Sequence, residues 1–195
     1  MQYPRQLRKL ILKNKRGETE NIKMKKRGQV WIETVIYLLI AFVMIGLVLS
    51  FVRPKIEEMR DKAIIESSLE VMKNIDNLIL TIGSPGNKRL IDLSIKKGAL
   101  IIDGENNKMI FEMESRYIYT EPGESIAIGN MVAKTTDKGE YNIITITRDF
   151  GANYDLTYQG ANIEKKLNKA STPYKLYMTN NGAITNNLIN IDFNL

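Results

Sequence analysis

The chain has 195 residues and a formal net charge of +6, with 28 Lys or Arg against 22 Asp or Glu. It contains no cysteine, which excludes disulfides, thiolate metal sites and a cysteine nucleophile. It also contains no histidine, so the usual general base and the commonest zinc ligand are missing. The acidic residues form no recognisable catalytic group. We therefore expect a protein that is not an enzyme and that binds no metal or cofactor.

The positive charge is concentrated at the amino end. Residues 1–28 hold ten Lys or Arg and two Glu, a net charge of +8, which leaves −2 for residues 29–195. A basic segment directly before an apolar one stays on the cytoplasmic side of a membrane, so this distribution favours membrane insertion over nucleic-acid binding. We expect residues 1–28 to be a basic cytoplasmic leader. Met24 is an alternative translation start, and otherwise residues 1–23 are interpreted as a disordered or weakly amphipathic tail.

An uncharged apolar segment follows the leader. Residues 34–52 are rich in Ile, Leu, Val, Phe and Met, and a helix of this length crosses about 30 Å of hydrocarbon. The sequence predicts a single membrane span here, with the amino terminus in the cytoplasm. Glu33 lies at the start of the span, where a carboxylate is costly and usually has a partner. Glu33 is therefore a candidate functional residue, unless it simply lies among the headgroups as part of an ordinary signal anchor.

The helical pattern continues after the span. Beyond Pro54, apolar residues recur at helical spacing, which predicts an amphipathic helix. We expect one helix over residues 29–82, kinked or restarted at Pro54, with Asp61 and Asp76 among the polar residues on its other faces. Its apolar stripe should pack partly on the protein's own head and partly on partner subunits. The stripe consists of Ile56, Met59, Ala63, Ile64, Met72, Ile75, Leu78, Ile79 and Ile82.

Residues 83–195 have the period of β-strands. Gly83-Ser84-Pro85-Gly86-Asn87 has turn composition and should end the helix. The later alternation predicts about seven to nine short strands, with a hairpin around residues 103–107 and a short helix or charged loop at 161–170. Expected strands include Leu100/Ile102, Met109/Phe111/Met113, Tyr117/Tyr119, 140–149, Tyr154/Leu156/Tyr158, Tyr174/Leu176/Met178 and Ile189/Ile191/Phe193/Leu195, and expected turns are Pro122-Gly123, Lys138-Gly139 and Asn181-Gly182.

The predicted fold class is α+β: a long N-terminal helix, transmembrane and then amphipathic, followed by an antiparallel β-sandwich-like head. The head, residues 83–195, should lie outside the cell. Because its strands and turns are self-contained in sequence, we expect the fragment from about Gly86 onward to fold alone as a soluble domain.

The segment around the leader's end contains a composite motif. Lys25-Lys26-Arg27-Gly28 is followed by Gln29, and Glu33 occupies the fifth position after the glycine. With the long helix behind it, this arrangement resembles the type IV pilin superfamily in its archaeal class III signal peptide form. Trp31 and Tyr37 depart from the euryarchaeal pattern, which often has Ser and Leu at these positions. The resemblance covers residues 25 to about 82.

The resemblance implies a processing site at Lys25, Lys26, Arg27, Gly28 and Gln29, where a prepilin peptidase would cut after Gly28. It further implies a major or minor pilin of an archaeal pilus, a fimbrium, with cell adhesion as one role. The mature filament would be extracellular or on the cell surface. Partners would be other copies of the chain or other pilins, an assembly ATPase and a membrane platform protein.

In such a filament Gln29 and Glu33 would act in subunit assembly. Glu33 would neutralise the Gln29 ammonium of a neighbouring subunit, because unpaired charges are very costly in a low-dielectric core. The alternative from another class is an unprocessed single-pass membrane protein whose β-domain binds or senses a ligand.

Overall fold

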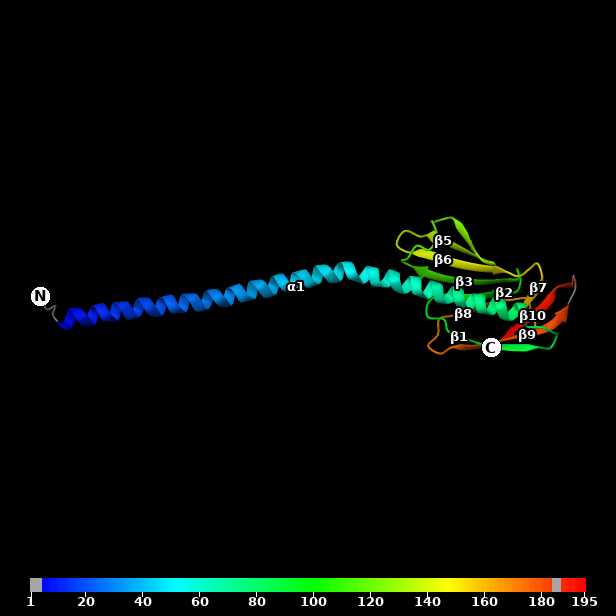
Figure 1. Cartoon of the computed structure of the whole chain (residues 1–195), viewed down its shortest axis with the longest axis horizontal. Helices are drawn as coiled ribbons and strands as arrows, with labels where there is room; N and C mark the ends of the chain where they lie inside the picture. The colour runs from blue at the N-terminus through cyan, green and yellow to red at the C-terminus, as the bar shows by residue number, and fades with distance from the viewer. Residues whose placement is uncertain (1–4, 184–186) are drawn as a thin grey trace. The chain divides into compact units, whose positions relative to one another are not determined.

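The computed structural model describes the backbone of residues 5–183 and 187–195, and the side chains of residues 30–183 and 187–195. One long helix is followed by two β-sheets in which antiparallel pairing dominates, an α+β architecture (Figure 1). The chain divides into two units, Met1–Arg53 and Pro54–Leu195. The second unit includes the end of the helix, so the compact unit begins well before residue 83, where the sequence placed the head.

The helix, α1 (Arg5–Leu80), continues through Pro54. Of the two alternatives expected at this proline, a kink or a restart, the restart is therefore wrong, and the helix continues with the loss of one backbone donor. The helix ends just before the predicted turn, where Gly83 adopts a φ of 78°. Two side chains bind carbonyls at this end: Asn87 Nδ2 donates to Ile82 O at 2.8 Å, and Asn180 Nδ2 donates to Gly83 O at 2.7 Å.

The larger sheet has six strands in the order β4-β5-β6-β3-β2-β8, and every neighbouring pair is antiparallel. The predicted hairpin is confirmed, because Asp103 pairs with Lys108 at its turn. Residues 161–170 contain a strand, β8, and not a helix or loop. The strands of this sheet are β2 (Ala99–Asp103), β3 (Lys108–Ser115), β4 (Ser125–Ile128), β5 (Met131–Asp137), β6 (Asn142–Asp149) and β8 (Glu164–Asn168).

The smaller sheet has the order β1-β9-β10-β7, and its β10–β7 pair is parallel. Asn181-Gly182 does not form the expected turn. It lies inside β9, where the register with β10 shifts and Gly182 has a φ of 91°, so the dipeptide forms a β-bulge. The strands are β1 (Lys88–Leu93), β7 (Tyr154–Tyr158), β9 (Tyr174–Ala183) and β10 (Ile189–Asn194).

Tyr117 and Tyr119 do not form the expected strand. They follow β3 in the loop that leads to β4. The loop lies beside the helix: Lys62 Nζ is 5.7 Å from the centre of the Tyr117 ring, and Arg116 forms a 2.9 Å ion pair with Glu57. The alternation that suggested a strand therefore reflects packing of both tyrosines on the core.

One hydrophobic core joins the helix to both sheets. Asp61 and Asp76, assigned from sequence to the polar faces, are each 5% exposed, so that assignment is wrong. The later part of the predicted stripe is confirmed, because Met72, Ile75, Ile79 and Ile82 are buried, but its first part is wrong, because Ile56, Met59 and Ala63 are exposed. The head therefore shares its core with the helix. The helix residues in the core are Ile65, Leu69, Met72, Ile75 and Ile79, followed by Ile82 just after the helix.

Candidate functional site

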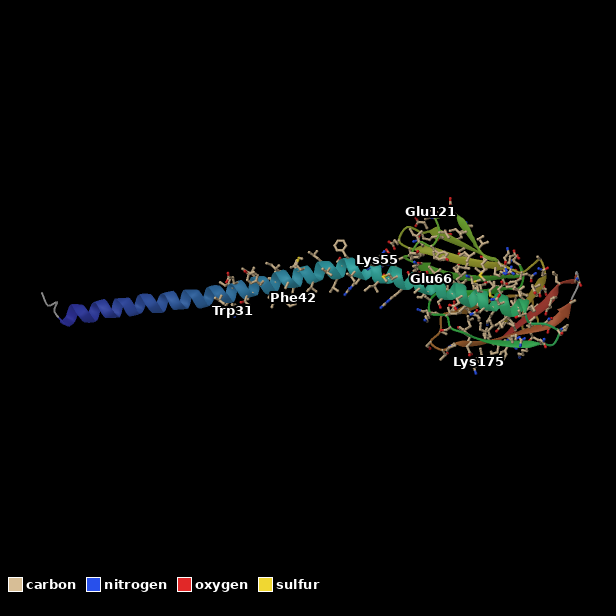
Figure 2. All side chains as sticks on the ribbon, viewed as in Figure 1. Trp31, Phe42, Lys55, Glu66, Glu121 and Lys175 are labelled. Carbon is tan, nitrogen blue, oxygen red and sulfur yellow. The ribbon has the colours of Figure 1, made fainter. Side chains whose placement is uncertain are left out.

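The candidate site is the exposed apolar part of α1. From Val30 to Val52 every residue is exposed, including Trp31 and Phe42, whose side chains project away from the ribbon (Figure 2). Among the described residues, this stretch is long and apolar enough to cross a membrane. Covering a large apolar side chain contributes about 1.5–3 kcal/mol. So extensive an apolar surface is therefore costly to leave in water.

Glu33 lies on this apolar segment and is exposed. Gln29 precedes it by four residues and Tyr37 follows it by four, so all three share one face of the helix. The neighbouring Thr34 is satisfied within the helix, since its Oγ1 donates to Val30 O at 2.9 Å. Within residues 30–183 and 187–195, Glu33 forms no ion pair. The carboxylate is thus available to a group from outside this part of the chain.

The predicted processing residues lie on α1 directly before this segment. The side chains of Lys25, Lys26, Arg27 and Gln29 lie outside the described residues. The processing site at Lys25 to Gln29 therefore stays a prediction.

Two buried carboxylates attach the other part of α1 to the large sheet. Asp61 pairs with Lys97 and accepts the Arg116 backbone N–H at 2.8 Å. Asp76 accepts from Arg148 Nε at 2.7 Å and from Asn130 Nδ2 at 3.3 Å. Because both carboxylates are desolvated, each needs these donors, and together they define the rotation and register of the helix on the sheet.

The spacing of these two carboxylates in the sequence indicates that they lie on the buried helix face, although the prediction from sequence placed them on the polar faces. Asp61, Ile65, Leu69, Met72 and Asp76 follow one another at intervals of three or four residues. That spacing places them on one helix face. Their acidic character led to their assignment to the solvent side, because unpaired carboxylates are rarely buried.

A hollow of about 540 Å³ lies on the outward side of the large sheet. Its lining includes Glu112 and Glu114 together with Lys97, Lys166 and Lys169. Across the described part of the chain, no group of three or more acidic side chains is placed to hold a metal ion. The hollow is an open, mixed-charge surface, and we assign it no chemistry.

No protein-family model, curated protein sequence or solved structure matches this chain.

Proposed function

We propose that the protein is a structural subunit of an archaeal type IV pilus-like filament, a major or minor pilin. The observation that carries this proposal is the exposed apolar surface from Val30 to Val52, continuous in one helix with residues buried in the β-rich unit. The unit after Pro54 buries its own apolar helix face. Residues 30–52 have no such cover from the described part of the chain, and the helices of other subunits would provide it.

The proposed precursor spans the membrane once through residues 34–52, with residues 1–28 in the cytoplasm. Prepilin peptidase cuts between Gly28 and Gln29 and leaves the span attached to the product. An assembly ATPase and a membrane platform protein then transfer the chain from lipid into the filament. The β-rich units face outward, where they are available for adhesion.

Glu33 sets the axial register of the subunits in this proposal. Its carboxylate pairs with the new Gln29 ammonium of a neighbouring subunit. Such a pair is favourable mainly because either charge alone would be costly in the helix core. An amino-terminal glutamine can cyclise and lose its charge, and Glu33 would then need another donor.

Cleavage of the full chain tests the proposal. Co-expression with a prepilin peptidase should yield a membrane-bound product whose intact mass and amino-terminal sequence begin at Gln29. Gly28→Val should remain uncut while still inserting into the membrane, because a β-branched side chain hinders close approach to a protease. An unchanged mass of the native chain with active peptidase present would instead favour an unprocessed single-pass membrane protein with a binding or sensing β-domain.

A second experiment tests the role of Glu33. Glu33→Gln should still be processed, but its yield in sheared filaments should fall steeply, because the substitution removes the charge and preserves the size. Glu58→Gln is the matched control, since Glu58 is a half-exposed carboxylate on the same helix whose ion-pair partner among the described residues is Lys55. Normal filament yield from Glu33→Gln with an uncyclised Gln29 would eliminate the pairing mechanism.

A further inference from the structure

The edge strands of the two sheets differ in how they are protected against pairing with another chain. The free edge of β7 is covered by the β2–β3 hairpin: Leu156 N donates to Asn107 Oδ1 at 2.7 Å, and Gly104 N donates to Ile163 O at 3.1 Å. A Cβ on Gly104 would lie 2.9 Å from Leu156 O, so glycine allows this close cover. The edge strands β1 and β8 instead carry charged residues. These charges disfavour pairing of such an edge with another copy of itself, because like charges would face each other, but they do not exclude an uncharged partner strand.

The edge strand β4 has neither form of protection. Its sequence, Ser-Ile-Ala-Ile, has no charge, and it is the last strand of the large sheet. Ile126 is 47% exposed, and Val132 on the adjacent β5 is 45% exposed. An exposed apolar edge is a template for another strand. We propose that β4 of one copy pairs with β8 of the next copy, so that the six-stranded sheet continues from subunit to subunit.

The topology of the large sheet makes its two edges compatible. Because the sheet has six strands and every pair is antiparallel, β4 and β8 run in opposite directions. A second copy placed beside the first in the same orientation therefore brings β8 antiparallel to β4. The contact joins two different surfaces, so it propagates from copy to copy without closing as a two-fold dimer.

The register follows from a row of outward-facing residues that crosses the whole sheet. Successive pairs connect Ala127, Val132, Thr147, Ile110, Ile101 and Lys166. Extending this row places Ala127 opposite Lys166 of the next copy. Ile126 then lies opposite Leu167, and the Glu124 carboxylate lies opposite the Lys169 ammonium. The register thus brings one apolar pair together within the strands and one pair of opposite charges together just beyond their ends, while Lys166 and Lys165 face the uncharged Ala127 and Ile128.

The direction of the helix distinguishes this contact from a symmetric β4–β4 pair. Asp61 binds Arg116 beyond one end of β3, whereas Asp76 binds Arg148 near the other end of the β3–β6 pair, so this part of α1 runs along the strands. A two-fold antiparallel β4–β4 pair would reverse the helix of one copy. Subunits of the proposed filament share one direction. That common direction rests on the proposed function. The β4–β8 contact preserves it, because both copies keep the same orientation.

The contact is small, because β4 has only four residues. Stable protein interfaces bury about 1,200 Å² or more in total, and one short strand pair buries less. It therefore acts where copies are already concentrated, as in a membrane or a filament. Glu121, close to this edge, lies at the border of the unit (Figure 2).

Cysteine cross-linking of the full chain in membranes tests the proposal, because the native sequence has no cysteine. Ala127→Cys and Lys166→Cys are combined in one chain, and both positions are exposed. Mild oxidation should give a ladder of dimers, trimers and larger products that collapses to monomer on reduction. Each single variant should stay monomeric, because its cysteine has no counterpart on the next copy.

The controls separate this contact from others. Ala127→Cys with Leu90→Cys, which is exposed on the charged edge β1, should give no ladder. Dimers from Ala127→Cys alone would show a β4–β4 pair and overturn the proposal. Monomers throughout, or an equal ladder from the control pair, would also overturn it. Glu124→Lys should reduce the ladder about two- to fivefold, and adding Lys169→Glu should restore it.

The cross-linking result and the proposed function can fail separately. Peptidase cleavage is measured from the amino terminus and is independent of the ladder. A processed chain that forms filaments without a ladder would refute the strand contact alone. An uncut chain that still forms the ladder would refute the pilin proposal and leave the contact standing.

Discussion

The two parts of α1 on either side of Pro54 are both rich in apolar residues, but their environments are opposite. From Val30 to Val52 the apolar residues surround the helix and are exposed, whereas Ile65, Met72, Ile75 and Ile79 form one buried face. The later segment carries charged residues on its remaining faces. Packing against the sheets therefore buries its one apolar face, and the charged faces remain in water. The earlier segment has no polar face to present to water. One helix thus combines a self-contained packing surface with a surface that needs another molecule.

The largest expected effect comes from removing the buried helix face. A fragment of residues 86–195 should fail to fold as a stable monomer, while residues 54–195 should be folded and soluble. The loss of six buried side chains, five on the helix and Ile82 just after it, corresponds to about 10 kcal/mol, comparable to the whole stability of a domain. Circular dichroism and gel filtration of both fragments measure this. A cooperative thermal transition in the shorter fragment would contradict the shared core.

Removing a buried helix carboxylate should have the next largest effect. Asp76→Ala leaves the Arg148 guanidinium without its ion-pair partner, which should cost about 3–5 kcal/mol. The control is Glu58→Ala at a half-exposed position of the same helix. The Glu58 hydrogen bond raises the pKa of Lys55, but both groups are solvated, so stability should hardly change. Urea unfolding of the detergent-solubilised chain measures the free energy of unfolding of both variants. Equal losses of this free energy would contradict the assignment of Asp76 as the buried partner of Arg148.

Single apolar truncations sharpen the comparison within one helix. Ile75→Ala should destabilise the unit by about 2–5 kcal/mol, because Ile75 is fully buried. Ile56→Ala makes the same chemical change at a position that is 43% exposed and should cost much less. If both variants shifted the urea midpoint equally, the buried face would not be where the structure places it.

The smallest expected effect concerns the loop beside the helix. Burial raises the pKa of Tyr119 above its usual value, with a further contribution from Glu66. The folded state therefore holds the phenol proton more tightly than the unfolded state. Its contribution to stability is complete below about pH 10 and is lost as the pH rises through the folded-state pKa. Tyr119→Phe should flatten this decline, which alkaline urea titrations measure. An identical decline in the variant would exclude Tyr119 as its source.

Much of the architecture is predictable from local sequence. The uncharged run after Glu33 indicates a span, the stripe after Pro54 indicates an amphipathic helix, and alternation with a polar turn indicates the β2–β3 hairpin. Each signal depends on neighbours within a few residues, because side chains repeat with the period of the element that contains them. The candidate processing and assembly residues, Lys25 to Gln29 and Glu33, likewise follow from a short contiguous motif and remain predictions.

The sequence by itself therefore determined the fold class, a long helix followed by β-strands, and an apolar segment long enough to cross a membrane. Only the tertiary structure decided which helix face is buried, that Asp61 and Asp76 are inside, and that β7 pairs in parallel with β10. It also decided that β4 is left as an uncharged edge. These features depend on pairings between residues far apart in the chain. A buried carboxylate is stable only beside a cation that is distant in the sequence. A strand lies at the edge of a sheet only as a result of how all the other strands pair.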